Sequence, residues 1–320
     1  MYTSPEKSPR IVFMGTPELA SHVLQELVSN GFRVVAVVTA PDRPAGRGRK
    51  IKQSPVKELA VALNIPVLQP ENLKSPEFIS ELKSCKPDIQ VVVAFRMLPE
   101  SVWSIPPKGT FNLHASLLPD YRGAAPINWT IINGEKESGV TTFLLDHQID
   151  TGKILFQEKI PLQPYETAGS LHEKIKTAGA ELVVHTITAL NAGTVKPIPQ
   201  EELISGHDKL RKAPKIHKED CRIDWDKPSR EVVNHIHGLS PVPGAFCEVK
   251  VKQNVSALMK IYHARPMEVK HDVQSGKLLT DNKTYIRFAT KDGMVDILEL
   301  QLAGKKRMGT KELLRGMQFE

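Results

Sequence analysis

Cysteine and long apolar runs are scarce in this chain of 320 residues. The three cysteines (Cys85, Cys221 and Cys247) lie far apart without a CxxC pair, which argues against a disulfide framework and a zinc module. The longest apolar stretches, such as 34–38, fall far short of the roughly 18 residues that a membrane span needs. The amino-terminal MYTSPEKSPR lacks the apolar core of a signal peptide. We therefore expect a reduced, cytoplasmic protein without a membrane segment.

Common nucleotide-binding and catalytic signatures are also missing. The turn after the first apolar run reads MGTPE, which matches neither GxGxxG nor the P-loop pattern GxxxxGKS or GxxxxGKT, so the use of ATP or NAD is not indicated. No serine or cysteine lies in a nucleophile motif, and His235 and His237 lack the further ligands of a metal site. Any acyl transfer is therefore expected to proceed by direct attack of an amine, without a metal ion.

Positive charge is concentrated in the last third of the chain. Residues 1–205 hold 21 Lys and Arg against 21 Asp and Glu, whereas residues 206–320 hold 22 against 15, and this difference makes up the whole net charge of +7. A neutral segment joined to a basic one is typical of a catalytic domain attached to a domain that binds a polyanion. A basic domain without such a partner is the alternative.

Strand and helix patterns alternate in the first part of the chain. Apolar runs at 10–14, 34–38, 65–68 and 89–94 are separated by helical patterns that begin near Pro17, Pro55 and Pro76. Further strands are expected at 110–114, 140–145 and 154–160, with helices at 126–132 and 170–190. Continuous apolar strands between helices predict an α/β fold, a doubly wound and mostly parallel sheet, over residues 8–190.

A second and smaller domain is expected after a linker. Gly193, Pro197 and Pro199 break the periodicity, so we place a linker over residues 191–218. Short runs then alternate with turn residues, at 245–251, 258–263, 276–280, 284–289 and 294–300. This pattern predicts a β-barrel domain, similar to an OB-fold, over residues 219–320.

Asn112 and His114 stand out as candidates for chemistry. Strand alternation places both side chains on one face, near the carboxyl end of a strand, where open α/β sheets bind ligands. An amide N–H can stabilise an oxyanion and an imidazole can exchange a proton near neutral pH, so the pair suits acyl transfer. Two structural polar residues with satisfied hydrogen bonds are the competing interpretation.

A loop with two carboxylates follows a later strand. It reads DHQIDTG over residues 146–152. One carboxylate, from Asp146 or Asp150, could orient His114 or balance its charge. Asx turns, in which a carboxylate binds its own backbone, are the alternative interpretation of the loop.

A basic segment, residues 43–52, lies between the second expected strand and the following helix. We expect its prolines and glycines to keep it irregular and mobile, and to let it contact RNA phosphates near the active site. A solvated loop is the alternative. Its cations are Arg43, Arg47, Arg49, Lys50 and Lys52, and a second cluster comprises Lys305, Lys306 and Arg307.

Several blocks of the sequence resemble methionyl-tRNA formyltransferases, from Arg10 to about Arg315. The motif NxHxSLLPxxRGAxP with a downstream DTG is similar to formyltransferases that use 10-formyltetrahydrofolate, whereas PDRPAGRG and AGKK resemble the tRNA enzymes more specifically. The matching blocks are FMGTPELA, TAPDRPAGRGRK, SPVK, FNLHASLLPDYRGAAPI, IDTG, APKIHKEDCRIDW and LAGKKRMG.

The resemblance implies formyl transfer from the co-substrate 10-formyltetrahydrofolate to the α-amino group of methionyl initiator tRNA, for translation initiation. It implies a formyltransferase-like catalytic domain, and a β-barrel that helps to hold tRNA. Asn112 would polarise the formyl carbonyl and stabilise its oxyanion, with assistance from His114. Asp150 would keep His114 suitably charged and shuttle a proton through water. We expect a monomer.

Binding residues also follow from the resemblance. The segment that borders the folate is expected to comprise Ser116, Leu117, Leu118 and Pro119, together with Phe95, Arg96 and Met97. The turn that carries Arg96 is shorter here than is common in the family. The tRNA is expected to contact Arg43, Arg47, Arg49, Lys50, Lys305 and Lys306.

Two rival functions are weighed against this one. A formyltransferase that acts on a small amine, such as a ribonucleotide or an amino sugar, leaves the basic segment and the basic second domain without a purpose. An RNA-binding module that has lost its catalytic face does not explain why Asn112, His114 and Asp150 occur together.

Overall fold

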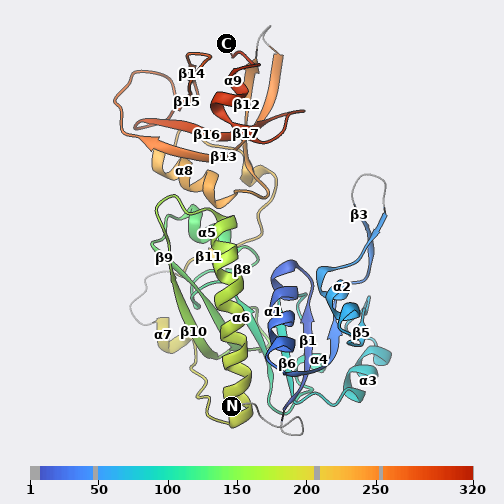
Figure 1. The fold of residues 1–320 in the computed structure, drawn as a ribbon. Helices are drawn as coiled ribbons and strands as arrows, with labels where there is room; N and C mark the ends of the chain where they lie inside the picture. Colours follow the sequence, from blue (N-terminus) through green and yellow to red (C-terminus); the bar gives the residue numbers. More distant parts are fainter. Residues whose placement is uncertain (1–7, 46–49, 205–209, 252–254, 320) are drawn as a thin grey trace. The chain divides into compact units, whose positions relative to one another are not determined.

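The computed structural model describes residues 8–45, 50–204, 210–251 and 255–319 (Figure 1). By its internal contacts the chain divides into two compact units, each built from several segments. The first unit comprises the chain up to Arg122 with residues 139–160 and 174–211, and the second comprises residues 123–138, 161–173 and the chain from Lys212 onward. No helix in the described ranges is long and apolar enough to cross a membrane.

A seven-stranded sheet forms the centre of the first unit. Its order is β10-β9-β7-β6-β1-β2-β5, in which β7, β6, β1, β2 and β5 run parallel and β9 lies antiparallel to β7. This arrangement confirms the predicted doubly wound, mostly parallel sheet. The strands are β1 (Arg10–Gly15), β2 (Arg33–Val38), β5 (Val67–Leu68), β6 (Ile89–Val93), β7 (Thr110–His114), β9 (Glu137–Leu144) and β10 (Ile154–Pro161).

Serine–proline pairs start two of the helices. The Ser54 hydroxyl accepts a hydrogen bond from the backbone N–H of Lys57, and Ser75 does the same for Phe78, while each following proline occupies a first-turn position where no N–H is needed. The described helices are α1 (Glu18–Ser29), α2 (Pro55–Ala62), α3 (Pro76–Ser84), α4 (Glu100–Trp103), α5 (Pro126–Ile132), α6 (Ala168–Ala192) and α7 (Glu201–Ile204).

Helices cover both faces of the sheet, and the side chains of β7 alternate between these two faces. On one face, Val92 belongs to a buried cluster with Phe78 of α3 and Val102 of α4. On the other face, a Cβ added at Gly179 of α6 would overlap Leu113, so α6 lies directly on β7. Because strand residues alternate, Leu113 faces α6 while Asn112 and its neighbours at alternate positions face the opposite side.

The basic segment departs from the sequence-based prediction. It was expected to be irregular, but β3 (Arg43–Ala45) and β4 (Lys50–Lys52) pair as an antiparallel ribbon, with Pro44 opposite Ile51. Proline is tolerated here because a ribbon of two strands has only edge strands, where a missing N–H can face outward. Residues 46–49, between the two strands, lie outside the described residues.

The second unit contains a curled antiparallel sheet, a half-barrel. Its order is β12-β13-β16-β15-β14, with β17 paired to β16, and in the described ranges no pairing joins the two ends into a closed barrel. The predicted small β domain is thus present as a half-barrel. Its strands are β12 (Ala245–Val251), β13 (Val255–Met267), β14 (Leu278–Thr280), β15 (Ile286–Ala289), β16 (Met294–Leu302) and β17 (Met308–Gly309).

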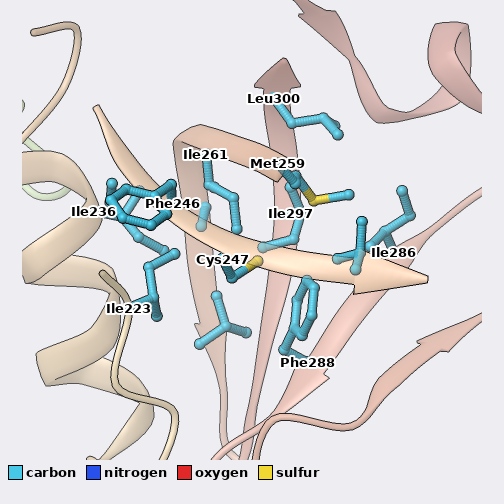
Figure 2. Close-up of a cluster of buried hydrophobic side chains, with 14 of the residues drawn as sticks. Ile223, Ile236, Phe246, Cys247, Met259, Ile261, Ile286, Phe288, Ile297 and Leu300 are labelled. Atoms are coloured by element: carbon cyan, nitrogen blue, oxygen red, sulfur yellow. The ribbon is translucent and has the colours of Figure 1, made fainter. Parts of the chain in front are cut away.

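One apolar core holds this half-barrel together (Figure 2). Met259 and Ile261 of β13, Ile297 of β16 and Phe288 of β15 are buried in it, and Trp225 stacks on Phe288 with ring centroids 4.2 Å apart. The sequence-based prediction missed two helices of this unit, α8 (Ser229–Gly238) and α9 (Thr310–Leu314). The remaining short elements are β8 (Arg122–Gly123), β11 (Lys212–Ala213) and the 3₁₀ helix η2 (Glu219–Cys221).

Candidate active site

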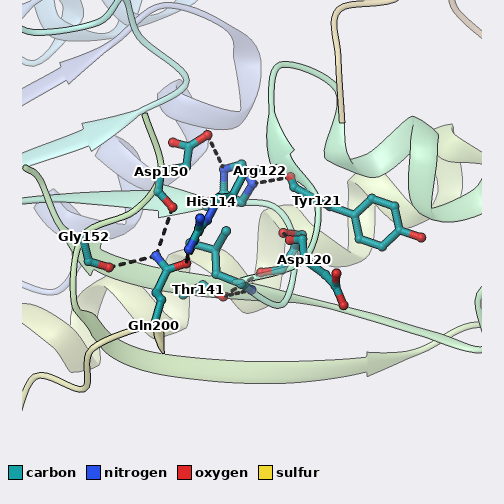
Figure 3. Close-up of polar contacts among 10 residues, drawn as sticks. His114, Asp120, Tyr121, Arg122, Thr141, Asp150, Gly152 and Gln200 are labelled. Atoms are coloured by element: carbon teal, nitrogen blue, oxygen red, sulfur yellow. Dashed lines mark hydrogen bonds and ion pairs between the residues drawn. The ribbon is translucent and has the colours of Figure 1, made fainter. Parts of the chain in front are cut away.

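His114 lies between a carbonyl and a carboxylate at the carboxyl end of β7 (Figure 3). Its side chain is only 7% exposed. The Nε2 atom is 2.9 Å from the carbonyl oxygen of Tyr121, and Nδ1 is 4.0 Å from Oδ2 of Asp150. The structure therefore brings together two of the residues that the sequence analysis selected, His114 and Asp150, from strand and loop segments far apart in the chain.

The contact with Tyr121 decides which imidazole nitrogen carries a hydrogen. A backbone carbonyl can only accept, so Nε2 of His114 must donate. Nδ1 is then the nitrogen that can gain or lose a proton, and it is the one that faces Asp150. The geometry thus leaves Nδ1 facing the Asp150 carboxylate, 4.0 Å away.

Asn112 lies two residues before His114, on the same face of β7. Its side chain is half-buried and makes no hydrogen bond to any residue in the described ranges. An amide that is partly enclosed yet unpaired can donate its N–H groups to an incoming oxygen atom. Asn112 is therefore suited to stabilising an oxyanion beside His114.

Asp150 sits in a tight loop between β9 and β10. Its backbone has a φ of 56°, in the left-handed region that residues other than glycine rarely adopt. Two residues later, a Cβ added at Gly152 would overlap the carbonyl oxygen of Leu144, so the DTG motif needs its glycine. The loop is held in a conformation that the local sequence alone does not favour.

The second carboxylate of the loop has a different role. Oδ1 of Asp146 accepts hydrogen bonds of 2.9 Å from the backbone N–H of Gln148 and from the Thr151 hydroxyl. Asp146 therefore forms an Asx turn, while Asp150 faces His114. The Asx-turn interpretation thus holds for Asp146, and the role of Asp150 toward His114 stays a prediction.

Gln200 is a buried residue of the site that the sequence analysis did not select. Its amide nitrogen donates to the carbonyl oxygens of Asp150 and Gly152, at 3.0 and 2.8 Å. Its amide oxygen accepts from Nε and Nη2 of Arg122, at 3.0 and 2.6 Å. No local signal marks this glutamine in the sequence, because its partners are about 50 or more positions away and no motif surrounds it.

The expected folate segment after β7 is pinned through its backbone. The Thr141 hydroxyl donates to the carbonyl of Ser116 at 2.7 Å and accepts from the N–H of Leu118 at 3.2 Å. Gln157 donates to the carbonyl of Leu118 at 2.8 Å. The Leu118 side chain is buried against Phe143, so this segment offers a rigid edge beside His114. Leu117 is half-buried and Pro119 is buried.

The other expected folate segment, Phe95 to Met97, follows β6. Because β6 and β7 are parallel neighbours, their carboxyl ends meet at the same edge of the sheet. Arg96 donates to the carbonyls of Pro70 and Glu71, at 2.8 and 3.1 Å, and burial lowers its pKa. Met97 is 66% exposed.

The residues expected to contact tRNA belong to both units. Arg43 is exposed on β3, and Lys305 and Lys306 are exposed in the turn between β16 and β17. Arg47 and Arg49 lie outside the described residues, and of Lys50 only its backbone place at the start of β4 is described. Within the described ranges, no group of three or more His, Cys, Asp or Glu residues is arranged to hold a metal ion.

Sequence comparisons place both halves of the chain in formyltransferase families. The formyl transferase family model matches residues 9–187, and the model for the formyl transferase C-terminal domain matches residues 215–318. A methionyl-tRNA formyltransferase of Bacteroides thetaiotaomicron is 51% identical over 310 residues, covering 97% of this chain and 96% of that protein. One from Flavobacterium johnsoniae is 49% identical, with the same coverage of both chains.

Solved structures show the same fold. HypX of Aquifex aeolicus, in complex with tetrahydrofolic acid, aligns with a TM-score of 0.62 at 20% identity, over 96% of this chain and 47% of that one. An N-formyltransferase of Helicobacter canadensis, in complex with folinic acid and dTDP-3-aminofucose, aligns with a TM-score of 0.61 at 20% identity, over 94% of this chain and 100% of that one.

Proposed function

This chain belongs to the methionyl-tRNA formyltransferase family, and we propose that Asn112, His114 and Asp150 carry its reaction. The enzyme transfers a formyl group from 10-formyltetrahydrofolate to the α-amino group of methionyl-tRNA. The observation that supports the residue assignment is the juxtaposition of an unpaired amide, an imidazole and a carboxylate at the carboxyl end of β7. Such a set can stabilise an oxyanion and accept a proton at the same place.

Bond formation is the first step of the proposed mechanism. The lone pair of the neutral methionyl amine attacks the formyl carbon, a C–N bond forms, and the carbonyl electron pair moves onto oxygen. The Asn112 amide N–H donates to this oxyanion, and His114 adds positive charge beside it when Nδ1 is protonated. Donors fixed in place by β7 need little reorganisation during the reaction.

Proton movement completes the transfer. The attacking nitrogen becomes positively charged and releases a proton to the Asp150–His114 pair, directly or through water. The C–N10 bond of the folate then breaks, the carbonyl re-forms, and N10 takes up a proton as tetrahydrofolate leaves. The products are N-formylmethionyl-tRNA and tetrahydrofolate, and the three side chains end as they began.

Substrate binding is assigned to the segments around this centre. We propose that the folate lies along Phe95–Met97 and Ser116–Pro119, since these segments follow the adjacent parallel strands β6 and β7, and β7 ends at His114. We propose that methionyl initiator tRNA is held by Arg43, Arg47, Arg49, Lys50, Lys305 and Lys306. Such cations neutralise phosphates without reading sequence. We further propose a cytoplasmic monomer that acts in translation initiation.

Substitution of Asn112 tests the mechanism. Asn112→Asp keeps the shape of the side chain but replaces its N–H donor with a carboxylate oxygen. We expect the single-turnover rate to fall by about 10²–10³, the usual loss for one oxyanion donor, while the affinities for folate and tRNA stay within a few-fold. Asn30→Ala, at the exposed end of α1, is the control. An Asn112→Asp enzyme that transfers formyl at the wild-type rate contradicts the assignment.

A further inference from the structure

Gln200 uses the full hydrogen-bonding capacity of a primary amide while completely buried. Its exposed fraction is 0%. Both hydrogens of its nitrogen are directed at the carbonyls of Asp150 and Gly152, and both acceptor sites of its oxygen are occupied by the Arg122 guanidinium (Figure 3). A buried glutamine with every donor and acceptor paired fixes its partners firmly, because breaking any bond leaves a buried polar atom unsatisfied.

The donor side of Gln200 holds the loop that presents Asp150. The two carbonyls that it binds are those of Asp150, whose φ is positive, and of Gly152, so both lie in the loop between β9 and β10. The backbone of Asp150 determines the direction of its Cα–Cβ bond and therefore the position of its carboxylate, 4.0 Å from Nδ1 of His114. Releasing these carbonyls would free the loop to turn the carboxylate away.

The acceptor side of Gln200 holds the segment on the other side of the imidazole. Arg122 directly follows Tyr121, whose carbonyl accepts from Nε2 of His114. Tyr121 has a φ of 61°, and its own N–H donates to the carbonyl of Arg211 at 2.7 Å. One amide thus connects both groups that flank the imidazole: the Asp150 carboxylate through its nitrogen, and the Tyr121 carbonyl through Arg122.

We propose that Gln200 is a positioning residue, which holds the Asp150 carboxylate and the Tyr121 carbonyl on either side of His114. This inference rests on the proposed roles of His114 and Asp150. It extends the site into the segment that the sequence analysis assigned to a linker. A purely structural role, in which Gln200 only stabilises the fold, is the interpretation to be excluded.

Gln200→Glu separates the two interpretations. Glutamate has the same shape and keeps an oxygen for Arg122, but it has no N–H to donate to the two carbonyls. We expect kcat to fall by about 100-fold, as for a reacting group displaced by about 1 Å, with KM for folate and tRNA changed less than threefold. Gln200→Ala should lower kcat at least as much and also lower the melting temperature.

Gln90→Ala is the matched control. Gln90 is also a fully buried glutamine of the first unit, on β6, where its oxygen accepts from the Thr110 hydroxyl at 2.8 Å. Its loss should lower the melting temperature without changing kcat. Arg122→Lys provides a second test of the same contacts, because lysine keeps the charge but cannot donate from two nitrogens to the Gln200 oxygen. Arg122→Lys should also reduce kcat, but by a smaller factor than Gln200→Glu.

A spectroscopic measurement tests the positioning role independently of turnover. In full-length protein labelled with ¹⁵N-histidine, the imidazole signals of His114 report which nitrogen carries a hydrogen. They should change in Gln200→Glu and stay unchanged in Gln90→Ala. Wild-type kcat together with wild-type His114 signals in Gln200→Glu would overturn the inference. If formyl transfer itself is absent, the proposed function fails, while these signals still decide whether Gln200 positions His114.

Discussion

At the residue scale, the two nitrogens of the His114 imidazole have different partners and are therefore not equivalent. Nε2 is bound to a carbonyl and Nδ1 faces a carboxylate. In the mechanism that we propose, only Nδ1 of this ring gains or loses a proton, because Nε2 is bound to the Tyr121 carbonyl. The chemistry therefore depends on the precise setting of a few neighbouring groups rather than on the presence of histidine alone.

Replacing His114 should remove catalysis and spare tRNA affinity. We expect His114→Ala to lower kcat by about 10²–10⁴, the range typical of a lost acid–base group. The dissociation constant for charged tRNA should change less than twofold, because a side chain only 7% exposed offers a macromolecule little surface. Single-turnover kinetics and filter binding measure the two effects. A large loss of tRNA affinity would instead remove His114 from its chemical role.

The position of Gly152, in the DTG motif, should not tolerate even the smallest side chain. In Gly152→Ala the new Cβ would overlap the carbonyl of Leu144, so the loop that carries Asp150 must shift. We expect a drop in kcat of at least about tenfold and a loss of stability of about 1–3 kcal/mol, measured by steady-state kinetics and thermal unfolding. Gly316→Ala is the control, since nothing lies within 4 Å of its added Cβ. Equal behaviour of the two variants would contradict this account.

From the residues alone, the sequence pointed to Asn112 and His114, which share a strand face, while Asp150 was chosen over Asp146 only through the family resemblance. It could not select Gln200. The hydrogen bonds of Gln200 join segments far apart in the chain, and a single sequence contains no record of such pairings. It also could not decide which loop carboxylate faces His114, since the positions of Asp146 and Asp150 depend on how the loop folds.

At the element scale, the pairing of β3 with β4 places Arg43 opposite Lys52 in the basic segment. Arg47→Ala, at a position expected to contact tRNA, should raise KM for charged tRNA and reduce the salt dependence of binding by about one phosphate contact. Folate binding should stay the same. Lys83→Ala, on α3, is the control. Equal losses of affinity for folate and for tRNA would contradict the basic segment as a tRNA contact.

The half-barrel should lose stability in mild acid through His237, in the last turn of α8. Nε2 of His237 accepts from His263 at 2.9 Å and from the N–H of Ala264 at 3.2 Å. Burial lowers the pKa of His237 from 6.5 to about 4. Between these values the unfolded chain binds more protons than the folded one, so stability is complete above pH 6.5 and declines as the pH falls toward 4.

Hydrogen exchange measures this effect. The full loss through His237 is on the order of 3 kcal/mol. The exchange of the Ala264 amide should accelerate as the pH is lowered from 6.5 to 4.5, after correction for the intrinsic rate. His237→Gln, whose amide oxygen can accept the same two hydrogen bonds but does not titrate, should show a weaker dependence, and the remaining slope should come from His235, whose pKa burial also lowers to about 4. The same slope in both proteins would exclude His237 as its source.

Helices with local start signals and strands with apolar runs were predictable from the sequence, whereas the short ribbon of β3 and β4 and helix α8 were not. Ser54–Pro55 and Ser75–Pro76 mark α2 and α3 directly. The ribbon of β3 and β4 was predicted wrongly as irregular, because the pairing of the two strands outweighs the local preference of Pro44. Helix α8 was missed because its short apolar pattern lies among residues that resemble turns.

At the scale of the whole molecule, each compact unit combines segments that are not consecutive in the chain. Helix α5 groups with the second unit, where the Asn128 amide donates to the carbonyl of Gly238 at 2.7 Å. The boundaries 8–190, 191–218 and 219–320 remain a prediction, drawn from changes in periodicity and composition. Neither property reports contacts between distant segments.

The uneven charge is the other property of the whole molecule. All of the net charge of +7 arises after residue 205, in a chain whose amino-terminal part contains Asn112, His114 and Asp150. This division matches a substrate that is both a small reactive amine and a large polyanion. A small-amine acceptor would need only the first part.

The most direct test is the transfer of labelled formyl from 10-formyltetrahydrofolate, with charged initiator tRNA, charged elongator tRNA, uncharged tRNA and free methionine as parallel acceptors. We predict label on charged initiator tRNA alone, and its loss in His114→Ala. Label on none of the four, with folate still bound, would contradict the account and move the acceptor to a small amine.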